Sequence, residues 1–129
     1  MAREKGETQS ESQILSAIRK RLGREPDVVL WRLSQGGAMT RGGQTYRAGL
    51  SVNGASDLIG VLTIATSTAR GGPLGRFIAF EVKSPRGAVR PEQTMFLDLV
   101  RRMGGFAAVV RSEAEAVAAL DRARRGESE

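Results

Sequence analysis

Two charged side chains interrupt an apolar stretch in the second half of this 129-residue chain. The stretch contains Phe80-Glu81-Val82-Lys83, and because alternate residues of a β-strand share a face, Glu81 and Lys83 project together. Apolar segments that read as strands precede it and helical segments follow it, so we expect this strand to be central and covered on both faces. Burying two charges inside a sheet costs free energy, so they usually have a functional reason. The alternative is that Glu81 and Lys83 form an exposed ion pair on an amphipathic strand.

A second carboxylate, Asp57, opens another apolar run. By itself it is equally compatible with an ordinary turn residue. If the two strands are neighbours, Asp57, Glu81 and the backbone carbonyl of Val82 meet at one sheet edge as an oxygen-only site, the kind that Mg²⁺ prefers. Such an ion polarises a phosphate oxygen and lowers the pKa of a bound water, and Lys83 would hold or activate that water. The order D-(x)n-E-x-K therefore indicates chemistry on a phosphate.

The choice of lysine at position 83 is itself informative. Only three of the 20 basic residues are lysines, at positions 5, 20 and 83. Arginine keeps its proton in proteins, whereas the pKa of a buried lysine can be tuned, so Lys83 fits a role that arginine would not fill. With three lysines in total, chance placement is the alternative.

The chain contains no histidine and no cysteine. Their absence excludes disulfide scaffolds, zinc fingers, thiol nucleophiles and every mechanism that uses an imidazole as base. Catalysis by this chain must therefore use carboxylates, Lys, Arg, hydroxyls and amides, with any metal ion held by oxygen.

The formal net charge of +6 is unevenly distributed along the chain. Residues 12–111 hold 15 basic and 6 acidic side chains, whereas the two ends together hold 5 basic and 8 acidic ones. A basic middle suits a surface that meets a polyanion, with nucleic acid as the first candidate. The alternative is a domain whose basic residues are scattered over all faces.

The first element that must position these residues is a helix near the N-terminus. Thr8-Gln9-Ser10-Glu11 reads as a capping box, and Gly23 ends the helix. On the helical wheel Glu11 falls on the apolar side, so its carboxylate is expected to point along the buried stripe. Taken alone, a capping role for Glu11 is the simpler interpretation. The apolar stripe consists of Ile14, Leu15, Ile18 and Leu22.

The remaining elements predict an α/β domain with the order α-β-β-β-β-α-β-α, whose central mixed sheet has helices on both faces. A helix is expected to begin near Pro91 and end at Gly104-Gly105, and a last one to follow Ser112, capped with Glu115. We expect one domain over residues 9–125, with disordered tails at 1–8 and 126–129. The expected strands are 28–33, 45–50, 57–65, 77–83 and 106–110, with a glycine-rich connection at 35–44 and a turn at 66–75.

These motifs, in this order, resemble the VRR-NUC (virus-type replication-repair nuclease) family of the PD-(D/E)xK nuclease superfamily, over about residues 10–120. One departure is visible: Ser56 stands where the family pattern usually has proline, which affects the local turn and leaves the Asp57 carboxylate in place. The matching residues are Glu11, Ser56-Asp57-Leu58-Ile59-Gly60, Phe80-Glu81-Val82-Lys83-Ser84-Pro85, Arg90-Pro91-Glu92-Gln93 and Met103-Gly104-Gly105-Phe106-Ala107-Ala108-Val109-Val110-Arg111-Ser112.

The resemblance implies a restriction-endonuclease-like fold and a role for each matching residue. Asp57 and Glu81 would ligate Mg²⁺ or Mn²⁺, helped by the Val82 carbonyl, and Lys83 would position the attacking water. Glu11 would act through the water shell of the metal or through a second ion. Gln93 would hydrogen-bond across the site and help to orient Lys83; the alternative is an exposed glutamine in a first helical turn. Small members of this kind are similar to junction-resolving enzymes, which implies a homodimer facing branched DNA.

Three arginines are candidates for contacts with the nucleic-acid backbone. Arg86 and Arg90 flank the path from Lys83 to Gln93. Arg41 lies in the glycine-rich segment, which would track the phosphate backbone as a mobile loop or, alternatively, serve as a plain connection.

Together these features predict a metal-dependent DNA endonuclease that cleaves branched or flapped DNA. The alternatives are a non-catalytic nucleic-acid-binding module and a metal-dependent exonuclease. Few aromatic residues are present, which argues against binding single strands by base stacking. No apolar stretch approaches the roughly 20 residues that span a bilayer, and residues 1–10 are polar, so we expect a soluble, cytoplasmic protein.

Overall fold

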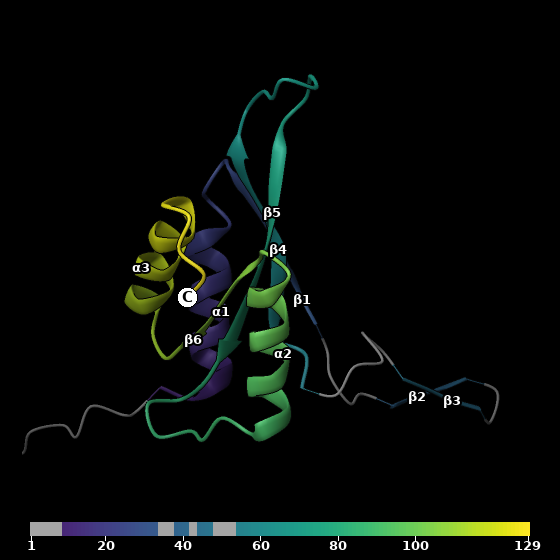
Figure 1. Cartoon of the computed structure of the whole chain (residues 1–129). Helices are drawn as coiled ribbons and strands as arrows, with labels where there is room; N and C mark the ends of the chain where they lie inside the picture. Colours follow the sequence, from purple (N-terminus) through teal and green to yellow (C-terminus); the bar gives the residue numbers. More distant parts are fainter. Residues whose placement is uncertain (1–8, 34–37, 42–43, 48–53) are drawn as a thin grey trace, which may run out of the picture.

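The computed structural model describes residues 9–33, 38–41, 44–47 and 54–129, and for 38–41 and 44–47 it describes the backbone. Figure 1 shows the arrangement of its helices and strands. In chain order these elements are α1 (Glu11–Leu22), β1 (Val28–Arg32), β2 (Ala38–Arg41), β3 (Gln44–Arg47), β4 (Leu58–Ala65), β5 (Leu74–Val82), α2 (Pro91–Arg102), β6 (Phe106–Val110) and α3 (Glu113–Arg124).

The central sheet has four strands in the order β1-β4-β5-β6. β4 pairs antiparallel with both β1 and β5, whereas β6 pairs with β5 in parallel through the α2 crossover. The strand that carries Glu81 is therefore an interior strand, as its sequence predicts. It also lies directly beside the strand that follows Asp57, which is the condition for the two carboxylates to meet.

Helices cover both faces of this sheet, which confirms the predicted α/β architecture. α1 and α3 pack together on one face over the main core, and α2 packs on the other face (Figure 1). The main core is centred on Phe80 and Phe106, whose rings meet edge to face with centroids 6.0 Å apart. The smaller core under α2 consists of Ala79, Leu97, Val100 and Ala107.

The first helix begins two residues later than its sequence pattern suggested. Ser10, with an extended backbone, accepts a hydrogen bond from the Gln13 N–H, and the Gln13 side chain accepts one from the Ser10 N–H. Serine is a better N-cap than threonine, and Ser10-x-x-Gln13 forms the same type of box as the one predicted from Thr8, which lies outside the described residues. Gly23 ends α1 and Ser112 caps α3, both as predicted.

Two other boundaries differ from the expectation. The glycine-rich connection predicted at 35–44 contains β2, because its backbone pairs antiparallel with β3, the returning strand predicted at 45–50. β5 begins at Leu74 rather than Phe77, because pairing with β4 continues past a bulge between Thr63 and Ala65. The paired ends of β4 and β5 thus extend beyond the helices (Figure 1).

The last four residues, expected to form a disordered tail, lie against the sheet. The Ser128 carbonyl accepts a hydrogen bond from the Ala107 N–H on the outer edge of β6, and the Glu127 carbonyl accepts one from Arg76. The strand edge and an arginine side chain thus supply donors to this segment. In the described part of the chain, no helix has the length and apolar character needed to cross a membrane.

Candidate active site

Glu81 and Lys83 lie at the carboxyl end of β5 and are both buried. Glu81 is 1 % exposed and pairs in register with Val109 on the face covered by α2. Lys83 is 8 % exposed, and its N–H extends the parallel ladder by donating to the Val110 carbonyl over 3.0 Å. Lys83 Nζ lies 3.6 Å from Glu81 Oε1. The alternative interpretation, in which Glu81 and Lys83 form an exposed ion pair on an amphipathic strand, is therefore excluded.

Asp57 reaches this pair from the neighbouring strand. It stands just before β4, and its Oδ2 accepts a hydrogen bond of 2.9 Å from the Val82 N–H. Its own carbonyl accepts the Leu33 N–H, which ties the end of β1 to the same place. The half-buried Asp57 carboxylate is thus held at the end of β5 by a backbone donor between Glu81 and Lys83.

Gln93 closes the site from α2. It is 6 % exposed, and its Nε2 donates to Glu81 Oε1 over 2.9 Å while its Oε1 accepts the Arg90 N–H over 2.9 Å. The alternative interpretation of Gln93 as an exposed glutamine in a first helical turn is therefore excluded. Gln93 and Lys83 share one acceptor, Glu81 Oε1, so any influence of Gln93 on Lys83 passes through that oxygen.

The turn that precedes Asp57 lies against the first turn of α2. Gly54 has φ +78°, and a Cβ there would collide with the Glu92 carbonyl oxygen. Glycine thus permits a close approach that holds Asp57 and Gln93 in one unit. Ser56, at the usual proline position, is fully buried, and its hydroxyl has no hydrogen-bond partner among the described residues.

Burial and neighbouring carboxylates shape the electrostatics of Glu81. Burial first, then the neighbouring Asp57 carboxylate, and more weakly the charge of Glu11, raise the pKa of Glu81 to about 8, while Lys83 opposes the shift. Within the described part of the chain, Glu81 Oε2 is buried without a hydrogen-bond partner. The site therefore holds more negative charge than its protein neighbours neutralise, and it favours either a proton or a cation.

These donors fit a hard divalent cation. Asp57, Glu81 and the Val82 carbonyl are oxygen donors, and the partnerless Glu81 Oε2 leaves one buried lone-pair site unused. No group of three or more acidic side chains close enough to bind one ion occurs among the described residues. Two carboxylates, a backbone carbonyl and water would have to complete such a coordination sphere, and Mg²⁺ usually keeps several waters.

A cleft of about 260 Å³ opens beside the carboxylates. Glu11 lines this cleft together with Leu15, so it lies on the side of the apolar stripe as expected. The expectation that its carboxylate points away from solvent was wrong: Glu11 is exposed, because as the first residue of α1 it lies beyond the buried contacts that begin at Ile14. Its charge nevertheless reaches Glu81. The cleft is lined by Glu11, Ser12, Leu15, Arg32, Asp57 and Val82.

Arg32 is a cleft residue that the sequence analysis missed. It ends β1 opposite Leu58, the residue after Asp57, and shares a strand face with Val28 and Leu30. A charged residue at the end of an apolar alternation is a signal that could have found it. Its guanidinium adds positive charge to a cleft that also contains two carboxylates.

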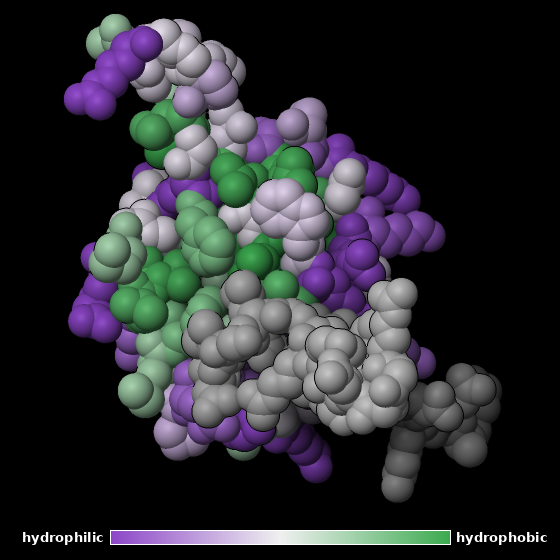
Figure 2. Space-filling view, turned by 90° about the vertical axis from the view of Figure 1, so that its right-hand side faces the viewer, coloured by the Kyte–Doolittle hydropathy of each residue, from purple (hydrophilic) through white to green (hydrophobic). Residues whose placement is uncertain are grey.

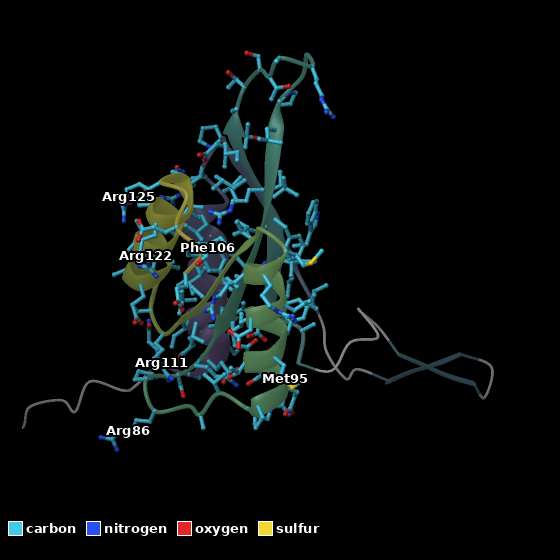
Figure 3. The ribbon with its side chains drawn as sticks, in the orientation of Figure 1. Arg86, Met95, Phe106, Arg111, Arg122 and Arg125 are labelled. Atoms are coloured by element: carbon cyan, nitrogen blue, oxygen red, sulfur yellow. The ribbon has the colours of Figure 1, made fainter. Side chains whose placement is uncertain are left out.

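A second missed residue, Arg111, supports the loop that follows Lys83. From the end of β6 its Nη1 donates to the carbonyls of Ser84 and Gly87 over 2.8 and 2.7 Å (Figure 3). It lies in the sequence stretch that carries the resemblance, although no role was predicted for it. Arg111 therefore helps to fix the path from β5 to α2.

The three predicted phosphate-contacting arginines lie in different places. Arg86 is exposed on this loop and projects away from the body of the protein (Figure 3). Arg90 gives its backbone N–H to Gln93, and its exposed side chain lies 3.5 Å from Glu92. Arg41 lies in β2, and its side chain is outside the described residues.

The family model for the VRR-NUC domain matches residues 2–114. The chain belongs to the VRR-NUC family. The match confirms the resemblance stated from the motifs, and with it a nuclease family of the PD-(D/E)xK fold that acts on nucleic acid and generally uses divalent metal ions. No curated protein and no solved structure matches the chain.

Proposed function

We propose that this VRR-NUC protein is a Mg²⁺- or Mn²⁺-dependent DNA endonuclease that hydrolyses phosphodiester bonds in branched DNA, such as a Holliday junction or a flap. It would act in the cytoplasm as a homodimer, in DNA repair. The observation that carries the proposal is the convergence of Asp57, Glu81 and Lys83 at one end of β5, with a buried Glu81 oxygen for which the described residues supply no partner.

Asp57, Glu81 and the Val82 carbonyl would hold the cation, which supplies Lewis-acid activation of a phosphate oxygen and a lower pKa for water. Gln93 keeps Glu81 oriented through its 2.9 Å hydrogen bond. Lys83 then has its ammonium next to the reacting region, where it can orient the attacking water and offset negative charge that develops on the phosphate.

Substrate binding is assigned to the basic side chains around the cleft. Arg32 lines the cleft itself and would contact a phosphate near the scissile bond. Arg86 would reach a more distant phosphate, because it projects outward from the loop (Figure 3). Phosphate contacts of this kind position DNA without reading its sequence, which suits an enzyme that recognises DNA shape.

Cleavage of labelled linear, flap, fork and four-way-junction DNA, with Mg²⁺, with Mn²⁺ and with chelator, tests the proposal. Wild type is expected to cut branched substrates only with metal, and Asp57→Asn and Lys83→Ala are expected to lose cutting. Asp98→Asn is the matched control, since Asp98 is an exposed carboxylate of α2. Undiminished cutting by Asp57→Asn would contradict the proposed site.

Two further outcomes identify the alternatives. Binding of all substrates without cutting in either metal would favour a non-catalytic nucleic-acid-binding module. Cutting of a linear strand from its ends, with a closed circular substrate left intact, would identify an exonuclease.

A further inference from the structure

The exposed large apolar side chains of the described residues gather on one side of the molecule. They come from β1, β4, β5, α2 and the residue that follows α2, and none comes from α1, α3 or β6. We name this set the apolar face; Figure 2 looks onto this side. It consists of Val29, Trp31, Val61, Ile64, Leu74, Phe77, Met95, Leu99 and Met103, which are between 39 % and 80 % exposed.

The apolar face exists because α2 covers only half of its side of the sheet. Leu97 and Val100 of α2 pack over Ala79 and Ala107, on β5 and β6. The β1–β4 half of the same face has no helix over it in the described part of the chain. There the register places Val29 opposite Val61, and Val61 opposite Phe77, so that three apolar side chains form a row across three strands.

α2 and the residue after it add a second row beside the first. Met95, Leu99 and Met103 follow at spacings of four and therefore lie along one side of the helix. Met95 projects to the side of the molecule that Figure 2 shows (Figure 3). Met103 meets the sheet at a hollow of about 240 Å³ that Phe77, Ile64 and Leu74 also line.

The amount of exposed apolar surface is large for a domain of this size. Aromatic side chains present about 150–250 Å² each and aliphatic ones somewhat less, so nine side chains that are 39–80 % exposed together leave on the order of 800 Å² in water. Monomers usually expose a largest apolar patch of about 300–600 Å². A standard interface buries about 800 Å² on each partner, so the apolar face is large enough for one stable contact.

The chemistry of the apolar face argues against DNA as its occupant, because phosphate contacts need basic side chains and these nine residues have none. Its shape suits a two-fold contact between identical surfaces: a projecting helical row and a hollow lie side by side, so the row of one copy can enter the hollow of the other. Methionine side chains adapt readily to such a fit.

We propose that the apolar face is the surface through which two copies of this chain associate. The inference rests on the homodimer of the proposed function and assigns its contact surface. Phe77 and Glu81 lie on the same face of β5, four residues or about 13 Å apart along the strand. Pairing through the apolar face therefore fixes the relative positions of two cleavage sites.

Solution mass of the full chain, measured by sedimentation over a range of concentrations, tests the proposal without reference to cleavage. Wild type is expected at twice the 13.8 kDa mass of one chain. The Leu99→Glu, Met103→Glu double variant is expected to raise the dimer dissociation constant by more than about tenfold, because each change places a charge in the contact. Both positions are exposed in the single chain, 45 % and 80 %, so the fold should be retained.

Two controls separate this result from other causes. Ala118→Glu places the same charge on an exposed position of α3, away from the apolar face, and should leave the dimer intact. Asp57→Asn should remain dimeric while losing cleavage, so failure of the dimer and failure of the nuclease are distinguishable. A monomeric wild type, or a double variant that dimerises like wild type, would overturn the proposal.

Trp31 provides an independent readout, because it is the single tryptophan of the chain and is 53 % exposed on the apolar face. On dilution its fluorescence emission is expected to shift to longer wavelength as the dimer dissociates. In the double variant the long-wavelength emission should be present at every concentration. Emission that does not change across the dissociation range would contradict the assignment of this surface.

Discussion

Two clusters of charged side chains in this domain shift the pKa values of their carboxylates in opposite directions. At the end of α3, Arg124 donates to Asp27 through two bonds of 2.8 Å and also contacts Glu25 and Asp121. Hydrogen bonding with Arg124 lowers the pKa of Asp27, and hydrogen bonds first with Arg21 and then with Arg124 lower the pKa of Glu25. At the end of β5, burial and a second carboxylate raise the pKa of Glu81 to about 8, and Lys83 compensates only in part.

The difference separates a structural ion network from a site prepared for a reaction. Around Arg124, the carboxylates lie at the surface and are stabilised as anions by a neighbouring cation, so the cluster ties α3 to the segment before β1. Around Glu81, negative charge accumulates where water is excluded, which costs stability unless a proton or cation enters. Substitutions at the Glu81 site and in its cleft should therefore change cleavage, whereas substitutions in the Arg124 network should change stability.

Glu81→Gln should have the largest effect. Cleavage in Mg²⁺ is expected to fall by about 10²–10⁴-fold, because the carboxylate is needed to hold the cation. Thermal unfolding without metal at pH 8 should be unchanged or shifted upward, since glutamine removes a buried charge. If the Glu81→Gln variant loses stability but keeps cleavage, the role of Glu81 is structural, like that of the carboxylates around Arg124.

The pH dependence of stability should have opposite signs for the two clusters. Folded Glu81 binds a proton that the unfolded chain releases near pH 4.5, so its contribution to stability falls between pH 4.5 and about 8, by about 1.4 kcal/mol per pH unit. The stabilisation from Asp27 is present above the ordinary pKa of an aspartate and is lost as the pH falls through its lowered value. Urea unfolding of metal-free wild type against Glu81→Gln isolates the first contribution; equal pH profiles would contradict it.

Gln93→Ala should have an intermediate effect. Removing the donor to Glu81 Oε1 is expected to lower cleavage by about 10–100-fold, as is typical when a residue that orients a metal ligand is lost. The apparent metal affinity should weaken, and raising the Mn²⁺ concentration should restore part of the rate. Full activity at low metal concentration would show that Glu81 does not depend on this bond.

Arg32→Ala should mainly weaken DNA binding. Loss of one phosphate contact is expected to reduce the slope of log affinity against log salt by about 1, with a higher KM and a smaller change in kcat. Arg32→Lys should restore the salt slope. An unchanged slope in Arg32→Ala would remove Arg32 from the substrate-binding surface.

Asp27→Asn should have the smallest effect and leave cleavage unchanged. The bidentate pair with Arg124 is partly exposed, so its loss should cost about 1 kcal/mol of unfolding free energy at neutral pH. Chemical denaturation measures this cost, and junction cleavage under the same conditions provides the comparison. A loss of cleavage without a loss of stability would contradict the distinction between the two clusters.

The sequence predicted those parts of the site that depend on local pattern. Strand alternation placed Glu81 and Lys83 together, and their position between apolar segments indicated an interior strand, as observed. The hydrogen bond of Gln93 across the site was expected only through the family resemblance, because first-turn glutamines are ordinarily exposed. Asp57 was ambiguous until the pairing of β4 with β5 placed it beside Glu81.

The features that were missed depend on contacts between distant parts of the chain. Arg32 enters the cleft because β1 pairs with β4 in one particular register, and Gly54 is needed because its turn meets α2. The start of α1 was misplaced because two overlapping sequences both fit a capping box. No local pattern distinguishes Ser10 from Thr8 strongly enough to settle that choice.

The hydrogen bond from the Ala107 N–H to the Ser128 carbonyl covers part of an edge of the sheet. A strand edge with free N–H and C=O groups is a template on which another chain can add a strand. The last residues occupy a donor on the outer edge of β6, and the ion pair between Arg101 and Glu129 helps to hold them there. On this side residues 127–129 cover part of the strand edge and hinder open-ended strand addition, the route by which exposed sheet edges lead to fibrous aggregates.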